Sequence, residues 1–421
     1  MRYNIFYLLF ISITAVISLT NCSKDEVVDP PEENIPYFSI KAEKLYLMYG
    51  HDHWVVVTND KGEVLDFQNL TAEGDYEFIE HSNELSEELG VYLFSISDFN
   101  DIYSINGYLN IPRGDIWSLK TRKGYGQYGI VNIRVSNFPS TWTDILLPAN
   151  NNTGGFSYNG MEEIDLDPWD GIADTVIFPL PIIKDSDTLI ITNALKDNDP
   201  RYLRISGVSP GQSYEFDFFE DFVPYDKIVN YQIQDEGDLY YTFVAGIQSN
   251  DIHYLTFRYK THETKFTQLG YINGFDFYNS TIKSKNYKGF SVVSFFKRGE
   301  PIDPNEIQFP QNDFQILNSS ISNFSYEASE ELVYRKSEWN KPSDRTYLTI
   351  YEKTSGSFKQ LSSVPFEIND LYPYVKLSDL QYRQSEFFDV VENYSYEEFI
   401  KEKFRDAELE TKWHIKVGYL K

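Results

Sequence analysis

Two histidines have the spacing of metal ligands. His51 and His53 stand one residue apart at the start of an apolar run, and in a strand such residues point to the same side. Two imidazoles side by side can hold a metal, but a complete site needs a third ligand, either His81 or a carboxylate brought close by folding. The alternative interpretation is a polar entrance to the strand.

A second group of candidate metal ligands is acidic. Asp165, Asp167 and Asp170 fall within the segment Asp165–Gly171, and loop carboxylates are the ligands that calcium prefers. Pro168 interrupts the alternate spacing of an EF-hand-type loop. Because the chain has 64 acidic residues, a solvated acidic loop is the competing interpretation. Calcium at these aspartates is the cofactor that this segment suggests, and apart from the two candidate metal sites no cofactor is predicted.

The segment Gly207–Gly211 satisfies the G-x-S-x-G pattern of a hydrolase nucleophile elbow around Ser209. Pro210 follows the serine and lacks the N–H that an oxyanion hole would use. The residues from Gln212 onward alternate like a strand, whereas the elbow needs a helix there. We therefore interpret the segment as a turn and predict no catalytic residue.

Three tryptophans lie in segments that are predicted to be loops: Trp142, Trp169 and Trp339. An exposed indole can cover the apolar face of a pyranose ring while nearby polar groups bond the hydroxyls, so these three are candidate ligand-binding residues. Each could instead cap the end of its own domain. The other three occupy alternating patterns and are predicted to be core residues: Trp54, Trp117 and Trp413.

The only cysteine ends an apolar N-terminal run. The run Ile5–Leu19 is short for a membrane span and predicts a signal peptide over residues 1–21. Since Cys22 has no second cysteine to pair with, it cannot form a disulfide within the chain. The segment Leu19–Cys22 resembles the lipobox of bacterial lipoproteins, with Asn21 in place of the usual small residue.

The next residues extend this resemblance. In Ser23–Glu26 a lysine and two acidic residues follow the cysteine, as in the export signal of surface lipoproteins of the Bacteroidetes. The resemblance implies an acylated Cys22 that anchors the protein in the outer membrane, facing the cell exterior. The alternative is a secreted protein whose thiol leaves with the cleaved peptide. Residues 22–36 are acidic and poor in large apolar groups, so we expect a lipidated flexible tether there.

The composition excludes one class of partner and favours one class of fold. Acidic residues outnumber basic ones by 64 to 37, and the net charge of −27 repels the phosphate backbone of nucleic acids. Aromatic residues make up 17% of the chain, with 33 tyrosines and 31 phenylalanines, and these residue types favour strands.

Strand-like segments separated by turn residues recur along the chain and predict an all-β protein. Trp54–Val57 and Val64–Phe67 flank the turn Asp60–Glu63 and together predict a hairpin. Further strands are predicted at residues 129–135, 188–192, 240–244, 254–259, 290–296 and 346–351. At the C-terminal end, Ser395–Glu398 forms a capping box that predicts a short helix over about 396–407. The period-two pattern of Trp413–Tyr419 then predicts a closing strand.

Four segments carry two resemblances to known sandwich domains. Val208–Phe216 is similar to the turn and tyrosine corner of fibronectin type III and immunoglobulin-like domains, and Ile111–Leu119 repeats its pattern. Asp60–Leu65 with Thr71–Phe78 resembles the carboxypeptidase-regulatory type of sandwich. These resemblances imply tandem β-sandwiches at 37–122 and 128–224, followed by a larger β-rich C-terminal region at 226–421.

The predicted surface-export signal and the loop tryptophans favour a non-catalytic surface lipoprotein that binds an extracellular ligand. Glycan is the leading class of ligand. One alternative is a structural, adhesive or assembly lipoprotein that contacts a protein partner. Another is a hydrolase in the C-terminal region. Nucleic acid is not an expected partner.

Overall fold

The structure is a computed structural model that describes the larger part of the chain. The described residues are 36–44, 46–47, 51–79, 86–97, 102–120, 129–137, 145–146, 164–166, 173–182, 187–193, 200–234, 236–248, 251–259, 264–288, 290–310, 315–327, 334–353, 359–361, 363–392, 394–405 and 413–420. They fold mostly into strands, which confirms the predicted all-β class.

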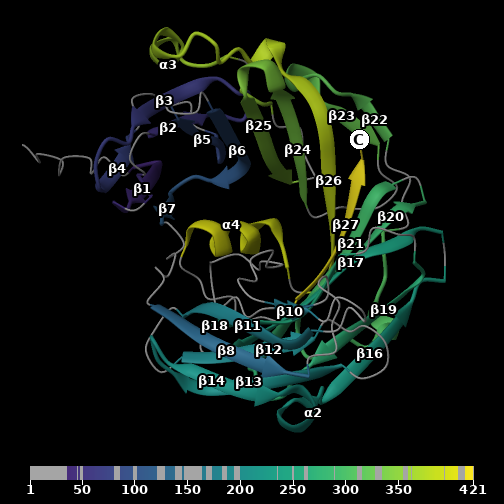
Figure 1. The fold of residues 1–421 in the computed structure, drawn as a ribbon. Helices are drawn as coiled ribbons and strands as arrows, with labels where there is room; N and C mark the ends of the chain where they lie inside the picture. The colour runs from purple at the N-terminus through teal and green to yellow at the C-terminus, as the bar shows by residue number, and fades with distance from the viewer. Residues whose placement is uncertain are drawn as a thin grey trace, which may run out of the picture.

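The largest element is a sheet of twelve described strands that curves around the short helix α4 (Tyr396–Phe404) (Figure 1). Its strands lie in the order β18 (Asp251–Tyr259), β17 (Asp238–Gln248), β20 (Phe277–Tyr287), β21 (Phe290–Gly299), β27 (Trp413–Leu420), β26 (Gln381–Glu392), β24 (Tyr334–Lys341), β25 (Thr346–Lys353), β6 (Ile102–Pro112), β5 (Glu88–Ser97), β2 (His51–Thr58) and β3 (Val64–Asn69). Its described neighbours pair antiparallel except β6 and β25, which pair in parallel.

Residues 129–224 form two packed sheets of four strands each. One sheet contains β10 (Ile164–Leu166), β11 (Ala173–Ile182), β8 (Gly129–Ser136) and β14 (Ser213–Asp217). The other contains β15 (Val223–Pro224), β13 (Arg201–Val208), β12 (Asp187–Asn193) and β9 (Ile145–Leu146). Their shared apolar core draws only on this part of the chain, including the one-turn helix α2 (Phe218–Asp221). The described strands of these two sheets run from residue 129 to residue 224, and the domain boundary at 128–224 stays a prediction.

The predicted separation of residues 37–122 from residues 226–421 needs correction. Strands β1 (Phe38–Ala42), β4 (Gly74–Phe78) and β7 (Asp115–Leu119) form a small sheet that packs on β2, β5 and β6. Residues 37–122 therefore do build two layers, but one layer continues into β25. The parallel pairing of Tyr103–Tyr108 with Thr346–Tyr351 joins the predicted 37–122 domain to the predicted 226–421 region in one sheet.

The two faces of the large sheet are covered by different segments. On the outer face, β16 (Lys227–Gln232) and β19 (Phe266–Tyr271) share a core with β17, β20 and β21. Farther along, the segment that contains α3 (Phe366–Leu371) packs over β2, β5, β6 and β25. A small hairpin of β22 (Gln315–Asn318) and β23 (Ser325–Glu327) lies beside β24 and β26.

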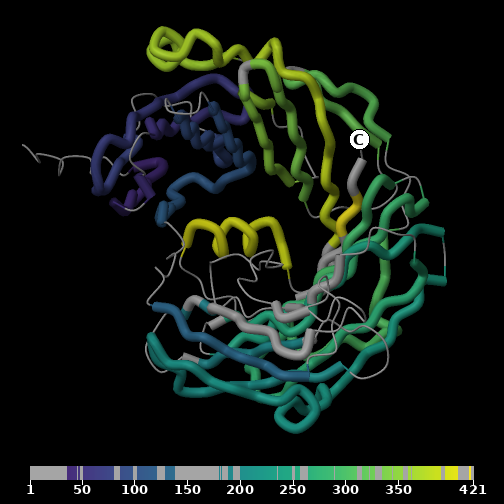
Figure 2. Tube along the Cα trace, viewed as in Figure 1, coloured from purple at the N-terminus to yellow at the C-terminus, as the bar shows by residue number. Residues whose placement is uncertain are grey.

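The predicted local elements are confirmed. The helix at 396–407 is α4, where the Ser395 side chain accepts a hydrogen bond from the Glu398 backbone N–H at 3.1 Å. The closing strand is β27, which lies between β21 and β26 inside the sheet. The hairpin is the β2–β3 pair, with Val57 opposite Asp66. The chain passes from the N-terminal strands through the sandwich and returns to α4 between them (Figure 2).

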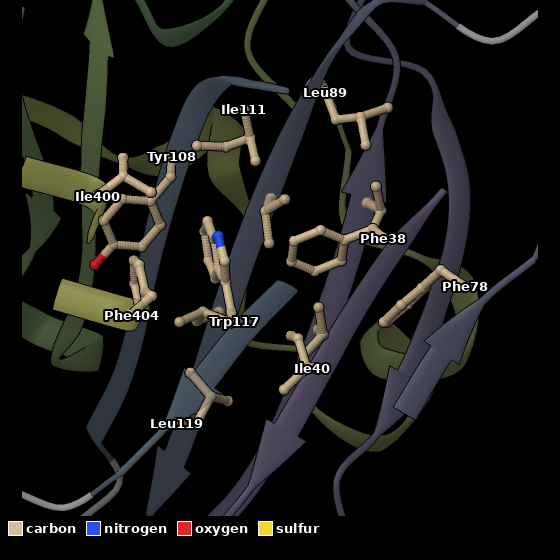
Figure 3. Packing of buried hydrophobic residues seen from close by; sticks show 14 of the residues in the cluster. Phe38, Ile40, Phe78, Leu89, Tyr108, Ile111, Trp117, Leu119, Ile400 and Phe404 are labelled. Carbon is tan, nitrogen blue, oxygen red and sulfur yellow. The ribbon is translucent and has the colours of Figure 1, made fainter. Parts of the chain in front are cut away.

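An aromatic cluster fixes α4 to the sheet. Phe404 of α4 stacks on Trp117 of β7 with 3.9 Å between ring centroids, and it meets the Tyr108 ring edge-on at 5.0 Å. Phe38 packs against the other side of Trp117 at 5.1 Å, as Figure 3 shows. Trp117 is 0% exposed, and this confirms its predicted core position. Buried aromatic rings of this size contribute strongly to stability.

Replacing Phe404 with alanine should therefore destabilise the fold. We expect the free energy of unfolding in urea to fall by about 3–5 kcal/mol, as is usual when a buried phenylalanine is truncated. The matched control is Phe366→Ala in α3, whose side chain is 76% exposed and whose loss should change the free energy by about 0.5 kcal/mol or less. Equal effects of the two variants would contradict the packing of α4 described here.

Candidate functional site

The face of the large sheet that α4 contacts, here called the inner face, combines aromatic and charged side chains. The strand register defines it, because every second residue of a strand points to the same side. One row of paired residues crosses the sheet from Lys285 through Val292 to Glu386, Lys336 and Tyr351. Several of these side chains are half-buried, so they are neither core residues nor fully solvated.

The first part of this face is an aromatic–lysine patch formed by Tyr240, Tyr241, Lys283, Lys285 and Phe296. The Lys283 ammonium lies 5.1 Å from the Tyr241 ring centroid and 5.7 Å from that of Phe296. The Lys285 ammonium lies 4.5 Å from the Tyr240 centroid. Each lysine is therefore placed for a cation–π interaction.

The aromatic side of the patch continues along β17 and β18. The rings of Tyr241 and Phe243 are stacked with 6.5 Å between centroids, and Tyr254 packs on Phe243 at 5.2 Å. All three side chains are half-buried. Half-exposed aromatic faces in a row are a surface on which flat, partly apolar ligands such as sugar rings can stack.

The second part of the face is a Glu–Lys cluster on β24 and β26. The Lys336 ammonium contacts Glu338 at 2.5 Å and Glu386 at 2.9 Å. Gln384 donates a hydrogen bond to Glu338 at 2.9 Å, and Arg383 lies 3.3 Å from the same carboxylate. The cluster presents amide, ammonium and carboxylate groups within one neighbourhood, as recognition of a hydroxyl-rich ligand requires.

Burial shifts the titration of this cluster. Desolvation raises the pKa of Glu386, and the nearby Lys336 ammonium opposes that shift. Burial would lower the pKa of Lys336, but the two carboxylates outweigh it and the pKa is raised. Lys336 is therefore held in its charged form between two carboxylates.

The candidate Trp339 lies elsewhere, and its predicted loop position is wrong. It belongs to β24, is 1% exposed, and donates its indole N–H to the Ser319 carbonyl at 2.8 Å. The ring packs with Phe324 and Tyr382 on the outer face. A buried indole cannot serve as an exposed stacking platform, so Trp339 is corrected to a core residue. The polar residues next to it, Glu338 and Asn340, occupy the alternate positions of the strand and point to the other face. These polar neighbours made the segment resemble a loop.

The remaining candidates are not placed. Five of them lie outside the described residues: Cys22, Trp142, Trp169, Asp167 and Asp170. The backbone of Asp165 belongs to β10, but its side chain is not described. Among the residues that are described, no group of three or more histidine, cysteine or acidic side chains is arranged to hold a metal ion.

The histidine pair does share one side of β2. The rings of His51 and His53 are stacked with 6.1 Å between centroids, and His51 Nδ1 lies 3.3 Å from the Ser95 hydroxyl. His53 is 6% exposed, packs on Tyr46 at 5.1 Å, and neither of its ring nitrogens has a hydrogen-bond partner in the described structure. The two imidazoles are thus adjacent without a third ligand from the described segments.

The segment around Ser209 is a turn, as predicted. The backbone N–H of Gln212 donates to the Ser209 carbonyl at 3.3 Å, and Gly211 has a φ of 76°, which favours glycine. The strand β14 follows directly. The geometry of a nucleophile elbow, which requires a helix at this point, is therefore not formed.

Sequence reasoning missed the aromatic–lysine patch and the Glu–Lys cluster. Tyr241 and Phe243 lie in a segment correctly predicted as a strand, but its exposed face was not assigned. In Ile282–Lys285, apolar or small residues alternate with lysines, and this alternation was the available signal. The partners of these lysines come from other strands, so only the pairing brings them together.

Comparison of the sequence with protein-family models and with curated proteins finds no match. In the described part of the chain, none of the helices has the length and apolarity needed to cross a membrane.

His53 should make stability sensitive to acid. Burial lowers its pKa, and the neighbouring His51 lowers it further, while Asp52 opposes the shift. The unfolded chain then binds a proton at a higher pH than the folded chain. The free energy of unfolding is therefore retained above about pH 6.5 and falls as the pH drops toward the folded-state pKa.

In His53→Phe, which keeps an aromatic ring against Tyr46, we expect a smaller loss of stability between about pH 7.5 and pH 5.5 than in the wild type. Urea unfolding at a series of pH values measures this. Parallel curves for the two proteins over that range would show that His53 is not titrating in a buried position.

Proposed function

We propose that this chain is a non-catalytic surface lipoprotein that binds an extracellular glycan on the inner face of its large sheet. The observation that carries the proposal is the row of half-buried aromatic rings beside lysine, amide and carboxylate groups on that face. Aromatic rings can cover the apolar face of a sugar, and the polar groups can bond its hydroxyls. Tyr241, Phe243 and Phe296 provide the stacking surface in this proposal.

The proposed location depends on the N-terminal sequence. The apolar run before Cys22 and the Lys-Asp-Glu sequence at residues 24–26 support acylation of the cysteine and export to the outer face of the outer membrane. The acyl chains anchor the protein, and residues 22–36 act as the tether. The strong negative charge would keep the anchored protein away from an anionic membrane surface.

The proposal extends to the sandwich at 129–224, which we infer to be fibronectin-like. The Tyr214 hydroxyl donates to the Gln212 side chain at 2.5 Å, next to the turn that precedes β14. The Gly211 N–H also donates to the Ile130 carbonyl of β8 at 2.8 Å. These contacts tie the turn to the neighbouring strands, as a tyrosine corner would do.

A second candidate function is docking of a protein partner. It is favoured by three large apolar side chains that α3 and the residues after it expose: Phe366 at 76%, Leu371 at 59% and Tyr374 at 64%. Their neighbours Ile368 and Val375 are buried and hold the segment on the sheet. Exposed apolar residues gathered on one segment are typical of interaction surfaces.

Glycan binding should depend on Tyr241. A glycan array followed by isothermal titration of the mature protein identifies the ligand, and Tyr241→Ala should weaken its affinity by about tenfold, or about 1.4 kcal/mol. Tyr374→Ala removes an exposed tyrosine from the α3 segment and is the matched control, which should bind like the wild type. Equal affinities for Tyr241→Ala and the wild type would count against the inner face. A loss of binding confined to Tyr374→Ala would instead support the α3 segment.

Membrane attachment should depend on Cys22. In cells that process lipoproteins, Cys22→Ala should move the protein from the detergent phase to the aqueous phase in phase partitioning, because each buried acyl methylene contributes about 0.8 kcal/mol of anchoring. Ser23→Ala, which leaves the cysteine in place, is the control and should stay in the detergent phase. Partitioning of Cys22→Ala with detergent would refute lipidation at this position.

A further inference from the structure

The aromatic–lysine patch concentrates positive charge in a chain whose net charge is −27. Lys283 and Lys285 are two residues apart on β20 and therefore point to the same side, although like charges repel. Neither forms an ion pair among the described residues. Asp238 lies opposite Lys285 in the register, but its carboxylate faces Lys265 at 3.6 Å.

The environment of Lys283 leaves its charge poorly compensated. The side chain is half-buried between Tyr241 and Phe296, and burial lowers its pKa, with only Glu386 opposing the shift. A partly desolvated ammonium over two aromatic faces has lost much of its hydration, and no carboxylate of the described segments is in hydrogen-bonding contact with it. An anion brought to this position would therefore be stabilised.

The backbone of β17 gives each lysine its own ring. The register between β17 and β20 shifts between Leu239 and Tyr241, which is a β-bulge. A bulge alters the direction of the side chains around the extra residue. Consequently the consecutive residues Tyr240 and Tyr241 both reach lysines of β20, although in a regular strand they would point to opposite faces.

A buried polar group next to the patch also lacks a hydrogen-bond partner among the described residues. The Ser294 residue is directly opposite Lys283 on β21, is 0% exposed, and its hydroxyl makes no hydrogen bond in the described structure. Unsatisfied buried polar groups are uncommon in folded proteins, and a binding role is one reason for which they are kept.

We infer that the aromatic–lysine patch binds an acidic sugar, whose ring stacks on Tyr241 and Phe296 while its anionic group contacts Lys283 and Lys285. This inference rests on the proposed glycan-binding function and specifies its ligand class. A small inorganic anion could neutralise the lysines but would leave the aromatic faces uncovered. A neutral sugar could cover the rings but would leave the lysines uncompensated. The anionic group is a carboxylate, as in uronic acids, or a sulfate ester.

The test compares three probes by isothermal titration: tetragalacturonic acid, its methyl ester, and a sulfated chondroitin tetrasaccharide. Wild-type protein should bind at least one of the two acidic probes at least tenfold more tightly than the neutral ester. The double variant Lys283→Gln with Lys285→Gln should lose that preference. Lys227→Gln is the matched control. Lys227 is an exposed lysine of β16, a strand on the outer face, so this variant should keep the preference for the acidic probe.

A measurement on the wild type alone guards against misfolding of the double variant. Raising the salt concentration from about 0.05 M to about 0.5 M should weaken binding of the acidic probe and leave the neutral ester unaffected. Thermal unfolding confirms that the variant is folded.

The outcomes separate this inference from the function on which it rests. Equal affinity for the acid and its ester, with both lost in Tyr241→Ala, would overturn the acidic specificity and retain glycan binding on the inner face. Binding of the acidic probe that the double variant retains would also overturn the inference, because the lysines would then not be its contacts. Absence of binding to these probes and to every glycan of an array would overturn both proposals.

Discussion

The parallel pairing of β6 with β25 is the interaction on which the rest of the structure depends. It joins strands from the first third of the chain to strands from the last third, so that twelve described strands form one sheet. Gly107 lies opposite Ile350 in this pairing, and a Cβ atom there would come within 2.6 Å of Ile350 and Tyr92. The absence of a side chain there lets the Tyr92 ring pack over β6 and lets the strands pair.

The continuous sheet gives the inner face its chemistry. Most core-forming side chains of the large sheet are apolar, and they point to the outer face or into the cluster around α4. Between them the sheet carries Lys283, Lys336 and Glu386, all half-buried. Half-buried charges reduce stability unless they are paired or ligand-bound. Lys336 and Glu386 satisfy this condition within the protein, whereas Lys283 rests on aromatic rings. This difference distinguishes a structural ion pair from a group that can bind a ligand.

Local features of the fold were predictable from the sequence, and long-range ones were not. The cap at Ser395, the β2–β3 hairpin and the alternation in β8 or β21 are recorded in neighbouring residues, so their patterns predict the elements directly. The pairing of β6 with β25 cannot be predicted in this way, because no local pattern of residues determines which distant strand pairs with β6. For this reason the sequence patterns predicted a domain boundary near residue 122, although the sheet continues across it.

The candidate site shows the same division. Trp339 appeared to be a loop residue because polar residues flank it, although in β24 the adjacent Glu338 and Asn340 point to the inner face and the indole to the outer face. Lys283 lies in an alternating segment, but its aromatic contacts come from β17 and β21, so they can be predicted only when the strand register is known.

The most direct test of glycan binding on the inner face is a crystal structure of the mature protein with the tightest-binding glycan of an array. We expect sugar rings stacked on Tyr241 and Phe296. A ligand bound only to the 129–224 sandwich or to the α3 segment, with the inner face free, would contradict this expectation.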